Sequence, residues 1–299
     1  MLNIYVIGCG GIGGYLLDLL PQALASASLD AIQANGTDIT PLLEKAGNCY
    51  IQCVADRLVL IDGDSFNARN ALRQGAGAGG KLVTRLRRIK DSMLMQTYLQ
   101  GMHLSGVDGY ITPDNMEDLI PRMAPENPDN MPDNAFADNS GGFVLPGRKH
   151  YASTVVFLCV DNVKTRYEVS KYMETFDNCL VINGGNERTT GHVTVYERVG
   201  GIPLDPNIMD IYPNITPDAD KRPDELACTA VAPKHDQIAV TNAIVANVMA
   251  MIFIRWLANG TINRQITRKG SVVVERKNEV VIDIETMTMT PLYHPRNDG

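Results

Sequence analysis

The stretch "IYVIGCGGIGGYLL", residues 4–17, decides the fold class of this chain. It begins with apolar and β-branched residues, continues into a turn rich in glycine, and ends in apolar residues at helical spacing. These features predict a strand at residues 2–7, followed by a helix at residues 12–20. A strand, a glycine turn and a helix in this order open many nucleotide-binding folds.

The glycines of this turn stand in the order G-x-G-x-x-G, which is formed by Gly8, Gly10 and Gly13. Backbone amides of such a turn, together with the N-terminus of the following helix, can hold a phosphate group. The motif alone is also compatible with tight packing of the strand against the helix. We expect a nucleotide-binding turn, because the strand and the helix that the turn requires are both predicted here.

Three further apolar runs continue the pattern: residues 57–61, "STVVFLCVDN" at 153–162, and "CLVINGG" at 179–185. Residues 164–175 lie between the last two and have helical spacing. Continuously apolar strands that alternate with helices are typical of a parallel sheet covered on both faces. The predicted fold class is therefore α/β, with a Rossmann-like, mainly parallel sheet, helices on both faces and a C-terminal β-hairpin.

The domain organisation is predicted to be one domain over residues 1–299, a length that can bury a large core. A basic helical segment is expected to begin at Lys81 and to extend to about residue 98. The predicted elaborations are insertions at about 22–55 (with an additional helix at 41–46) and 114–150, a crossing loop at about 203–232, and a hairpin at about 271–285, whose strands are residues 271–276 and 280–284.

Composition narrows the class of partner. The formal net charge of −7 disfavours a broad nucleic-acid-binding surface. The six cysteines form no Cys-x-x-Cys pair, so we expect reduced thiols and no structural zinc. The N-terminus lacks the features of a signal peptide, and we expect a cytoplasmic protein. Residues 238–257 are apolar but include polar side chains such as Asn242 and Arg255, which favours a buried core helix over a membrane span.

Acidic and basic residues follow the second predicted strand in "IDGDSFNARNALRQ", residues 61–74. In NAD-binding Rossmann units an acid at the end of this strand binds the ribose hydroxyls, and Asp62 occupies that place. Arg73 and Lys81 add cations, which a triphosphate requires and a dehydrogenase does not. These residues therefore favour ATP over NAD, with ordinary solvated surface charges as the plainer alternative.

The same stretch, with Lys81 after it and "CVDN" at 159–162, resembles the ThiF/MoeB superfamily, the adenylating enzymes that include the ubiquitin-activating enzymes. An acidic pair, an Asn-x-x-Arg-Gln string, a lysine and an Asp-Asn pair occur in the order found in that family. The resemblance covers residues 2 to about 257. It implies an ATP site formed by Gly8, Gly10, Gly11, Gly13, Asp62, Asp64, Asn70, Arg73, Gln74, Lys81, Asp161 and Asn162.

The resemblance also implies roles for these residues. Asp62 binds the ribose, while Asn70, Arg73 and Lys81 hold the phosphates, and Asp161 is the ligand of a Mg²⁺ ion. Arg73, Lys81 and Asp161 are the expected catalytic residues, together with Cys228. Several members of the family carry, near the position of Cys228, a cysteine that receives the activated carrier protein. The alternative is that Cys228 is an ordinary buried or surface thiol without a catalytic role.

The expected function is ATP-dependent adenylation of the C-terminal carboxylate of a small ubiquitin-like or sulfur-carrier protein, with thioester formation as a further step that the sequence leaves open. A homodimer is implied by the resemblance, and neither a nucleic acid nor a membrane is an expected partner. Two alternatives remain at this point: an NAD-dependent oxidoreductase on the same glycine turn, and a non-catalytic scaffold that retains the fold.

Overall fold

The structure is a computed structural model, and it describes residues 2–34, 53–66, 80–92, 99, 101–122, 153–221, 225, 238–259, 264–268, 271–275 and 277–296. Its strands are β1 (Leu2–Ile7), β2 (Arg57–Ile61), β3 (Ser65–Phe66), β4 (Gly80–Lys81), β5 (His103–Val107), β6 (Ser153–Leu158), β7 (Cys179–Asn186), β8 (Thr190–Val199), β9 (Ile202–Pro203), β10 (Arg264–Arg268), β11 (Ser271–Glu275), β12 (Glu279–Asp283) and β13 (Thr288–Leu292). Its helices are α1 (Gly11–Ala34), the 3₁₀ helix η2 (Leu82–Arg85), α3 (Leu86–Lys90), α5 (Met116–Leu119), α6 (Val163–Met173), α7 (Ile208–Ile211) and α8 (Ala239–Asn259).

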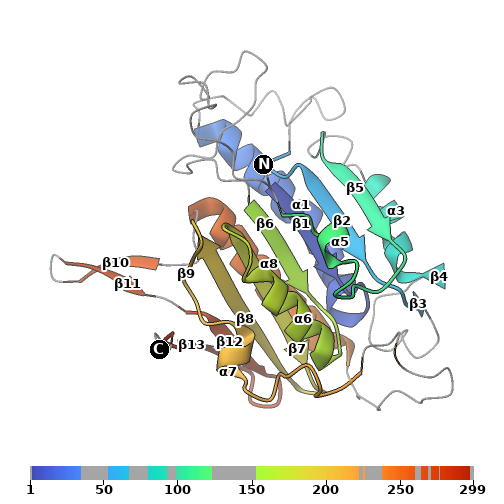
Figure 1. The fold of residues 1–299 in the computed structure, drawn as a ribbon. Coiled ribbons are helices and arrows are strands. Elements are labelled where there is room, and N and C mark those ends of the chain that lie inside the picture. The colour runs from blue at the N-terminus through green and yellow to red at the C-terminus, as the bar shows by residue number, and fades with distance from the viewer. Residues whose placement is uncertain are drawn as a thin grey trace.

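The central sheet has the strand order β13-β12-β8-β7-β6-β1-β2-β5, with β9 paired to β8 (Figure 1). The strands from β7 to β5 are parallel, and β8 and β12 continue the sheet in antiparallel pairings. After β1 the chain builds the sheet toward β2 and β5, and it then crosses back to form β6 and β7 on the other side of β1. The connections therefore diverge between β1 and β6, which is the place where open α/β sheets bind ligands.

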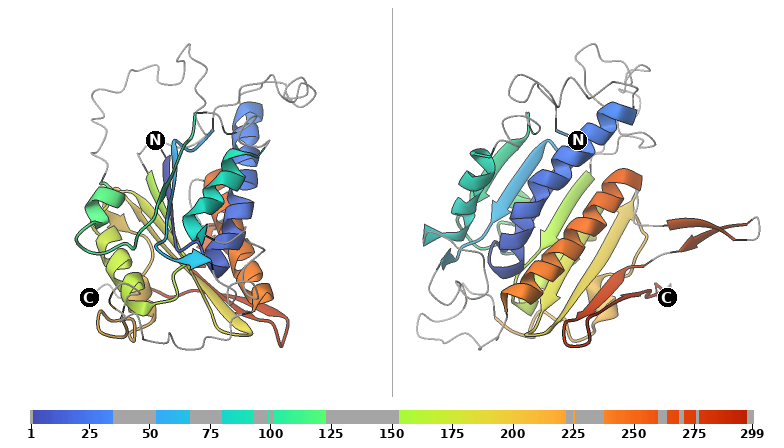
Figure 2. Two further views of the ribbon diagram at one scale, coloured as in Figure 1. Left: turned by 90° about the vertical axis from the view of Figure 1, so that its right-hand side faces the viewer. Right: turned by 180° about the vertical axis from the view of Figure 1, so that it is seen from behind.

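Helices cover both faces of the sheet. On one face α1 and α8 pack against side chains such as Ile4, Leu60 and Phe157 (Figure 2). On the other face α5 and α6 cover a second cluster, which includes Tyr5 and Val156. Because β1 is buried on both faces, its sequence is mostly apolar rather than alternating, with Asn3 as its buried polar residue. The predicted α/β class, with a Rossmann-like sheet between two helical layers, is confirmed.

The helix α8 is the core helix that the sequence predicts. It is long and apolar enough to cross a membrane, but 56% of its most apolar window is buried within the protein. Val245, Met249 and Phe253 are fully buried, and the helix packs against α1, β7 and β8. Its apolar character is thus explained by packing on the sheet.

The first helix is longer than predicted, because α1 continues to Ala34 with Pro21 inside it. A proline within a helix removes one backbone hydrogen bond and usually marks an end. Here Leu24 and Ala25 continue the buried stripe of the helix past the proline, and their burial outweighs the lost bond. The first helix therefore ends later than predicted, while the insertion at 22–55 stays a prediction and the additional helix predicted at 41–46 lies outside the described residues.

Two other local predictions were wrong in detail. In the described part of the helical segment expected from Lys81 to about residue 98, Lys81 ends the short strand β4, and η2 and the helix α3 follow as far as Lys90. Residues 93–98 lie outside the described residues. The C-terminal antiparallel strands are present, but β11 pairs with β10, while β12 pairs with β8 and β13. The expected pairing of residues 271–276 with 280–284 does not occur, because β12 extends the central sheet instead.

Candidate functional site

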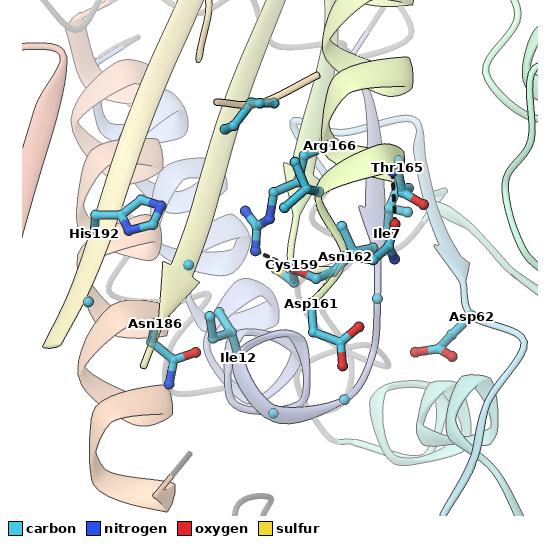
Figure 3. A pocket seen from close by; sticks show the side chains of 18 of the residues that line it. Ile7, Ile12, Asp62, Cys159, Asp161, Asn162, Thr165, Arg166, Asn186 and His192 are labelled. Atoms are coloured by element: carbon cyan, nitrogen blue, oxygen red, sulfur yellow. Dashed lines mark hydrogen bonds between the residues drawn. The ribbon is translucent and has the colours of Figure 1, made fainter. Parts of the chain in front are cut away.

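The candidate site is a cavity of about 750 Å³ at the carboxyl ends of β1, β2, β6 and β7, where the connections of the sheet diverge (Figure 3). A cavity of this size and place is typical of a small-molecule site. Its first part, here called the glycine-turn arm, is lined by Gly8, Gly10, Gly11, Ile12, Asp62, Asp64, Tyr110 and Asp161. Its second part, here called the β7–β8 arm, is lined by Arg166, Gly185, Asn186, Thr190, His192 and Tyr212.

The glycine turn joins β1 to α1 by close backbone packing. Gly8 has a φ of +87°, and its amide donates to the carbonyl oxygen of Ile61 at 2.9 Å. A Cβ atom on Gly8 would lie 2.8 Å from the carbonyl oxygen of Cys159, so no larger residue fits between β1 and β6. Gly10 and Gly11 line the cavity, whereas Gly13 packs against the turn and Cys159. The turn thus exposes backbone at the N-terminus of α1, where a phosphate can bind.

Asp62 follows β2 and closes the glycine turn from the other side. Its carboxylate accepts hydrogen bonds from the amide of Cys9 at 2.5 Å and from the amide of Asp64 at 2.7 Å. Burial raises the pKa of Asp62 from 3.8 to about 6, against the effect of the two amide donors, and the nearby charges of Asp64 and Asp161 raise it further. At neutral pH Asp62 is therefore an oriented, buried carboxylate that can accept hydrogen bonds from a ligand.

Asp64 and Lys81 lie at the edge of the glycine-turn arm. Asp64 accepts a hydrogen bond from the Tyr110 hydroxyl at 2.5 Å, and the Tyr110 ring leaves no room for a Cβ atom on Gly63. The Lys81 ammonium donates to the Gly63 carbonyl oxygen at 3.0 Å and lies 3.2 Å from Asp108. Lys81 does not line the cavity, so its expected contact with phosphates stays a prediction.

Asp161 and Asn162 follow β6 at the start of α6. The Asp161 side chain is exposed and points into the cavity near Asp62 (Figure 3). The Asn162 side chain is buried and caps α6 by accepting a hydrogen bond from the Thr165 amide at 2.8 Å. A second cap comes from Asp220, whose carboxylate accepts from the Val163 and Lys164 amides at 2.7 and 2.8 Å. Asp161 is thereby held on a fixed turn at the junction of the two arms.

The β7–β8 arm combines one buried cation with neutral polar side chains. Arg166 of α6 donates to the side chain of Asn183 and to two backbone carbonyl oxygens. His192 of β8 lies against Gly185 and stands 5.4 Å from the Tyr212 ring. Burial, aided by the charge of Arg166, lowers the pKa of His192 to about 4, so this imidazole is neutral at physiological pH.

Some of the predicted site residues are among the described residues, and others are not. Asp62, Asp64, Asp161 and Asn162 come together with three of the four predicted glycines around one cavity. The predicted residues Asn70, Arg73, Gln74 and Cys228 lie outside the described residues. Within the part of the chain that the structure describes, no group of three or more histidine, cysteine or acidic side chains could hold a metal ion.

Among the lining residues that the sequence analysis did not assign to the site are Tyr110, Arg166 and His192. A signal existed for Arg166, because it stands on the buried face of α6 with Val169, Ser170 and Met173. A basic residue at such a position suggests a polar network or a ligand. Nothing comparable distinguishes Tyr110 or His192, whose positions depend on how distant segments come together.

Comparison with known proteins supports the fold. No protein-family model and no curated protein matches the sequence. Among solved structures, E. coli MccB with ATP is similar, with a TM-score of 0.52, 14% identity, and coverage of 99% of this chain and 64% of that one. The microcin C7 biosynthetic enzyme MccB in complex with N-formylated MccA gives 0.52 and 14%, with 99% of this chain and 65% of that one.

This chain therefore spans less than two thirds of the length of the MccB structures that it matches. MccB is an adenylating enzyme of the ThiF/MoeB family. This chain shares its fold with MccB, so the α/β fold that the sequence predicts is confirmed.

Proposed function

We propose that this chain is an ATP-dependent adenylating enzyme that acts on a carboxylate, and that its substrate is the C-terminus of a small protein or peptide. The observation that carries the proposal is the meeting of the glycine turn, the buried Asp62 and the exposed Asp161 at the point where the connections of the sheet diverge. The shared fold with MccB, whose structure contains ATP, supports the choice of nucleotide.

The glycine-turn arm is proposed to hold ATP. Asp62 would accept hydrogen bonds from the ribose hydroxyls, as the acid at this place does in Rossmann units. The amides at Gly10 and Gly11, at the N-terminus of α1, would face the phosphates. Arg73, Asn70, Gln74 and Lys81 are proposed to complete the phosphate contacts.

A Mg²⁺ ion is proposed to bind at Asp161. Magnesium usually takes one or two carboxylates and completes its coordination with phosphate oxygens and water, so a single exposed carboxylate beside a phosphate site fits its requirements. When bound, the ion would neutralise phosphate charge. Asp161 is suited to this role because it is exposed and lies directly before a helix N-terminus that Asn162 and Asp220 cap.

The proposed reaction joins the carboxylate to AMP. A carboxylate oxygen attacks the α-phosphorus, a new oxygen–phosphorus bond forms, and the bond from the α-phosphorus to the bridging oxygen breaks as pyrophosphate leaves. The attacking carboxylate is already ionised, so no proton has to be removed. The protein's contribution is to orient the two anions and to reduce their repulsion by fixed dipoles and cations.

The partner is proposed to be a small ubiquitin-like or sulfur-carrier protein, or a peptide, whose tail enters the β7–β8 arm. This is supported by the space of that arm beside Asp161 and by the MccB structure in complex with N-formylated MccA. A homodimer and a later thioester at Cys228 belong to the same proposal. Both would extend the adenylation step without changing its site.

The test is pyrophosphate exchange into ATP. A panel of peptides with free C-terminal carboxylates, including acetyl-triglycine, is compared with the same peptides as C-terminal amides. Free acids should support exchange and AMP formation, and Asp161→Ala should lower the rate about 100-fold or more. Asp118→Ala, an exposed acid on α5, is the control and should exchange like the wild type. Equal exchange with the amides, or no exchange with any free acid, would contradict the proposal.

A further inference from the structure

Arg166 is a buried cation without a carboxylate partner. Its side chain belongs to a residue that is only 8% exposed, and its three hydrogen bonds go to the Asn183 side-chain oxygen and to the carbonyl oxygens of Val160 and Gly184, the last at 2.9 Å. Within the described residues, no acid lies within ion-pair distance of it. Burying a charge is costly unless an opposite charge compensates it. The carboxylates of Asp161 and Asp220 act on Arg166 only from beyond ion-pair distance, and burial still lowers its pKa, so the charge stays undercompensated.

The guanidinium is held rigidly in this place. Asn183, which accepts from one of its terminal nitrogens, itself donates to the Thr194 hydroxyl at 3.2 Å. The three acceptors come from the end of β6 and from β7, so the sheet fixes the position of the charge. All three hydrogen bonds use the terminal nitrogens, and the Nε–H edge has no acceptor among the residues that the structure describes.

The charge stands where the two arms of the cavity meet. Arg166 lines the cavity, and its bond to the carbonyl oxygen of Val160 places it directly behind the turn that carries Asp161. Figure 3 shows its guanidinium between His192 and that turn. His192 is neutral at physiological pH, while Glu187 and Arg188 are exposed at the mouth. Arg166 is therefore the buried positive charge among the described residues of the β7–β8 arm.

We propose that Arg166 positions the substrate carboxylate, by supplying the positive charge that holds this anion in the β7–β8 arm beside the α-phosphate. The inference rests on the proposed function for the identity of the reaction. The recognised chemical class is a carboxylate at the end of an uncharged, extended tail. An acid is selected over its amide because only the ionised group compensates the buried guanidinium.

The test compares acetyl-triglycine with acetyl-triglycine amide, each titrated in the absence of nucleotide. The wild type should bind the acid more tightly than the amide, and Arg166→Met should lower the affinity for the acid about tenfold or more while the amide is unaffected. Arg87→Met, which removes an exposed arginine of α3, is the matched control and should retain the preference. Arg166→Lys keeps the positive charge and should retain part of the preference for the acid over the amide.

A second measurement covers the case in which Arg166→Met does not fold. In the wild type, the ¹⁵N resonance of the Arg166 side-chain Nε, identified by its absence in Arg166→Lys, should shift with the acid and stay in place with the amide. A wild type that does not distinguish acid from amide, or an unmoved Nε resonance, would overturn the inference. Binding of ATP and Mg²⁺ is measured in a separate titration. A protein that binds no ATP is thereby distinguished from one in which Arg166 does not bind the carboxylate.

Discussion

At the scale of single residues, the candidate site depends on Asp62, a carboxylate that is buried and oriented at the same time. Two backbone amides hold its oxygens, while burial favours its neutral form and raises its pKa to about 6. These effects leave the carboxylate ionised at neutral pH but close enough to its pKa that mild acid neutralises it. A hydrogen bond from a ribose hydroxyl is stronger to a carboxylate than to a carboxylic acid.

Adenosine binding should therefore weaken as the pH falls through about 6, the raised pKa of Asp62. Adenosine is the suitable probe because it carries no phosphate whose own protonation would interfere. The sign of the stability effect is opposite: since the folded-state pKa is raised above 3.8, the folded protein gains stability from Asp62 as the pH falls from about 6 to about 4. Titration of adenosine by NMR at several pH values is the measurement, and an affinity that does not change with pH would refute it.

Gly8 and Gly80 offer a test of the close packing at the turn, because both have a positive φ, of 87° and 88°. A Cβ atom on Gly8 would collide with the backbone of Cys159, whereas nothing lies within 4 Å of one on Gly80. Gly80→Ala should lower the free energy of unfolding by about 1–2 kcal/mol, and Gly8→Ala by about 1–3 kcal/mol more. Urea unfolding of the two variants measures this difference; equal losses would show that the turn relaxes.

The positions of the acidic site residues could be predicted, because Asp62 and Asp161 each follow an apolar strand and parallel strands end at one edge of a sheet. The approach of Asp62 and Asp161 to each other could therefore be predicted from their places at the ends of two strands. Arg166 and His192 were not, since helical or strand periodicity shows which face a residue occupies but not which distant backbone it meets. Lys81 was expected at the phosphates by resemblance, and its contacts with Gly63 and Asp108 follow from local pairing of β3 with β4.

At the scale of elements, α6 is the helix that organises the site. Its first turn carries the Asn162 cap and receives Asp220 from the long segment after β9. Its buried face supplies Arg166 to the cavity. The Asp220 carboxylate satisfies two amides at the helix N-terminus and interacts favourably with the helix dipole. Two side chains therefore cap the N-terminus of α6, next to Asp161.

Asp220→Ala should lower the free energy of unfolding by about 1–2 kcal/mol, because the amides of Val163 and Lys164 lose their acceptor. Asp218→Ala is a control from the same segment, since Asp218 is exposed and should change stability by less than about 0.5 kcal/mol. Chemical unfolding of both variants is the measurement. If Asp218→Ala were as destabilising as Asp220→Ala, the cap would not explain the effect.

The periodicity of the sequence predicted most helices and strands, but it predicted neither the end of the first helix nor the pairing of the C-terminal strands. The first helix continues through Pro21, because burial of Leu24 and Ala25 is a tertiary effect that a local helix signal does not contain. The pairing of β11 with β10, and of β12 with β8, likewise depends on which strand edges remain available once the sheet has formed. The short connection between residues 271–276 and 280–284 suggested a hairpin. In the structure β12 instead extends the central sheet.

At the scale of the whole molecule, the order of strands places the chemistry. The chain first adds β2 and β5 on one side of β1, and then adds β6 and β7 on the other side. The glycine turn after β1 and the Asp161 turn after β6 therefore become neighbours, although they are far apart in sequence. Two helical layers bury the two faces of the sheet (Figure 2), and the cavity lies at its carboxyl edge. The proposed nucleotide site lies at this edge, where the glycine turn and Asp62 line the cavity.

The most direct test of this account is an equilibrium titration with ATP and Mg²⁺ on one side and NAD on the other. The account predicts that ATP with Mg²⁺ binds the wild type and that NAD does not displace it. It also predicts that Asp62→Ala weakens ATP binding about tenfold or more, while Asp118→Ala leaves it within about twofold. Displacement of ATP by NAD, or undiminished ATP binding by Asp62→Ala, would contradict the central claim that the cavity at the glycine turn is an ATP site.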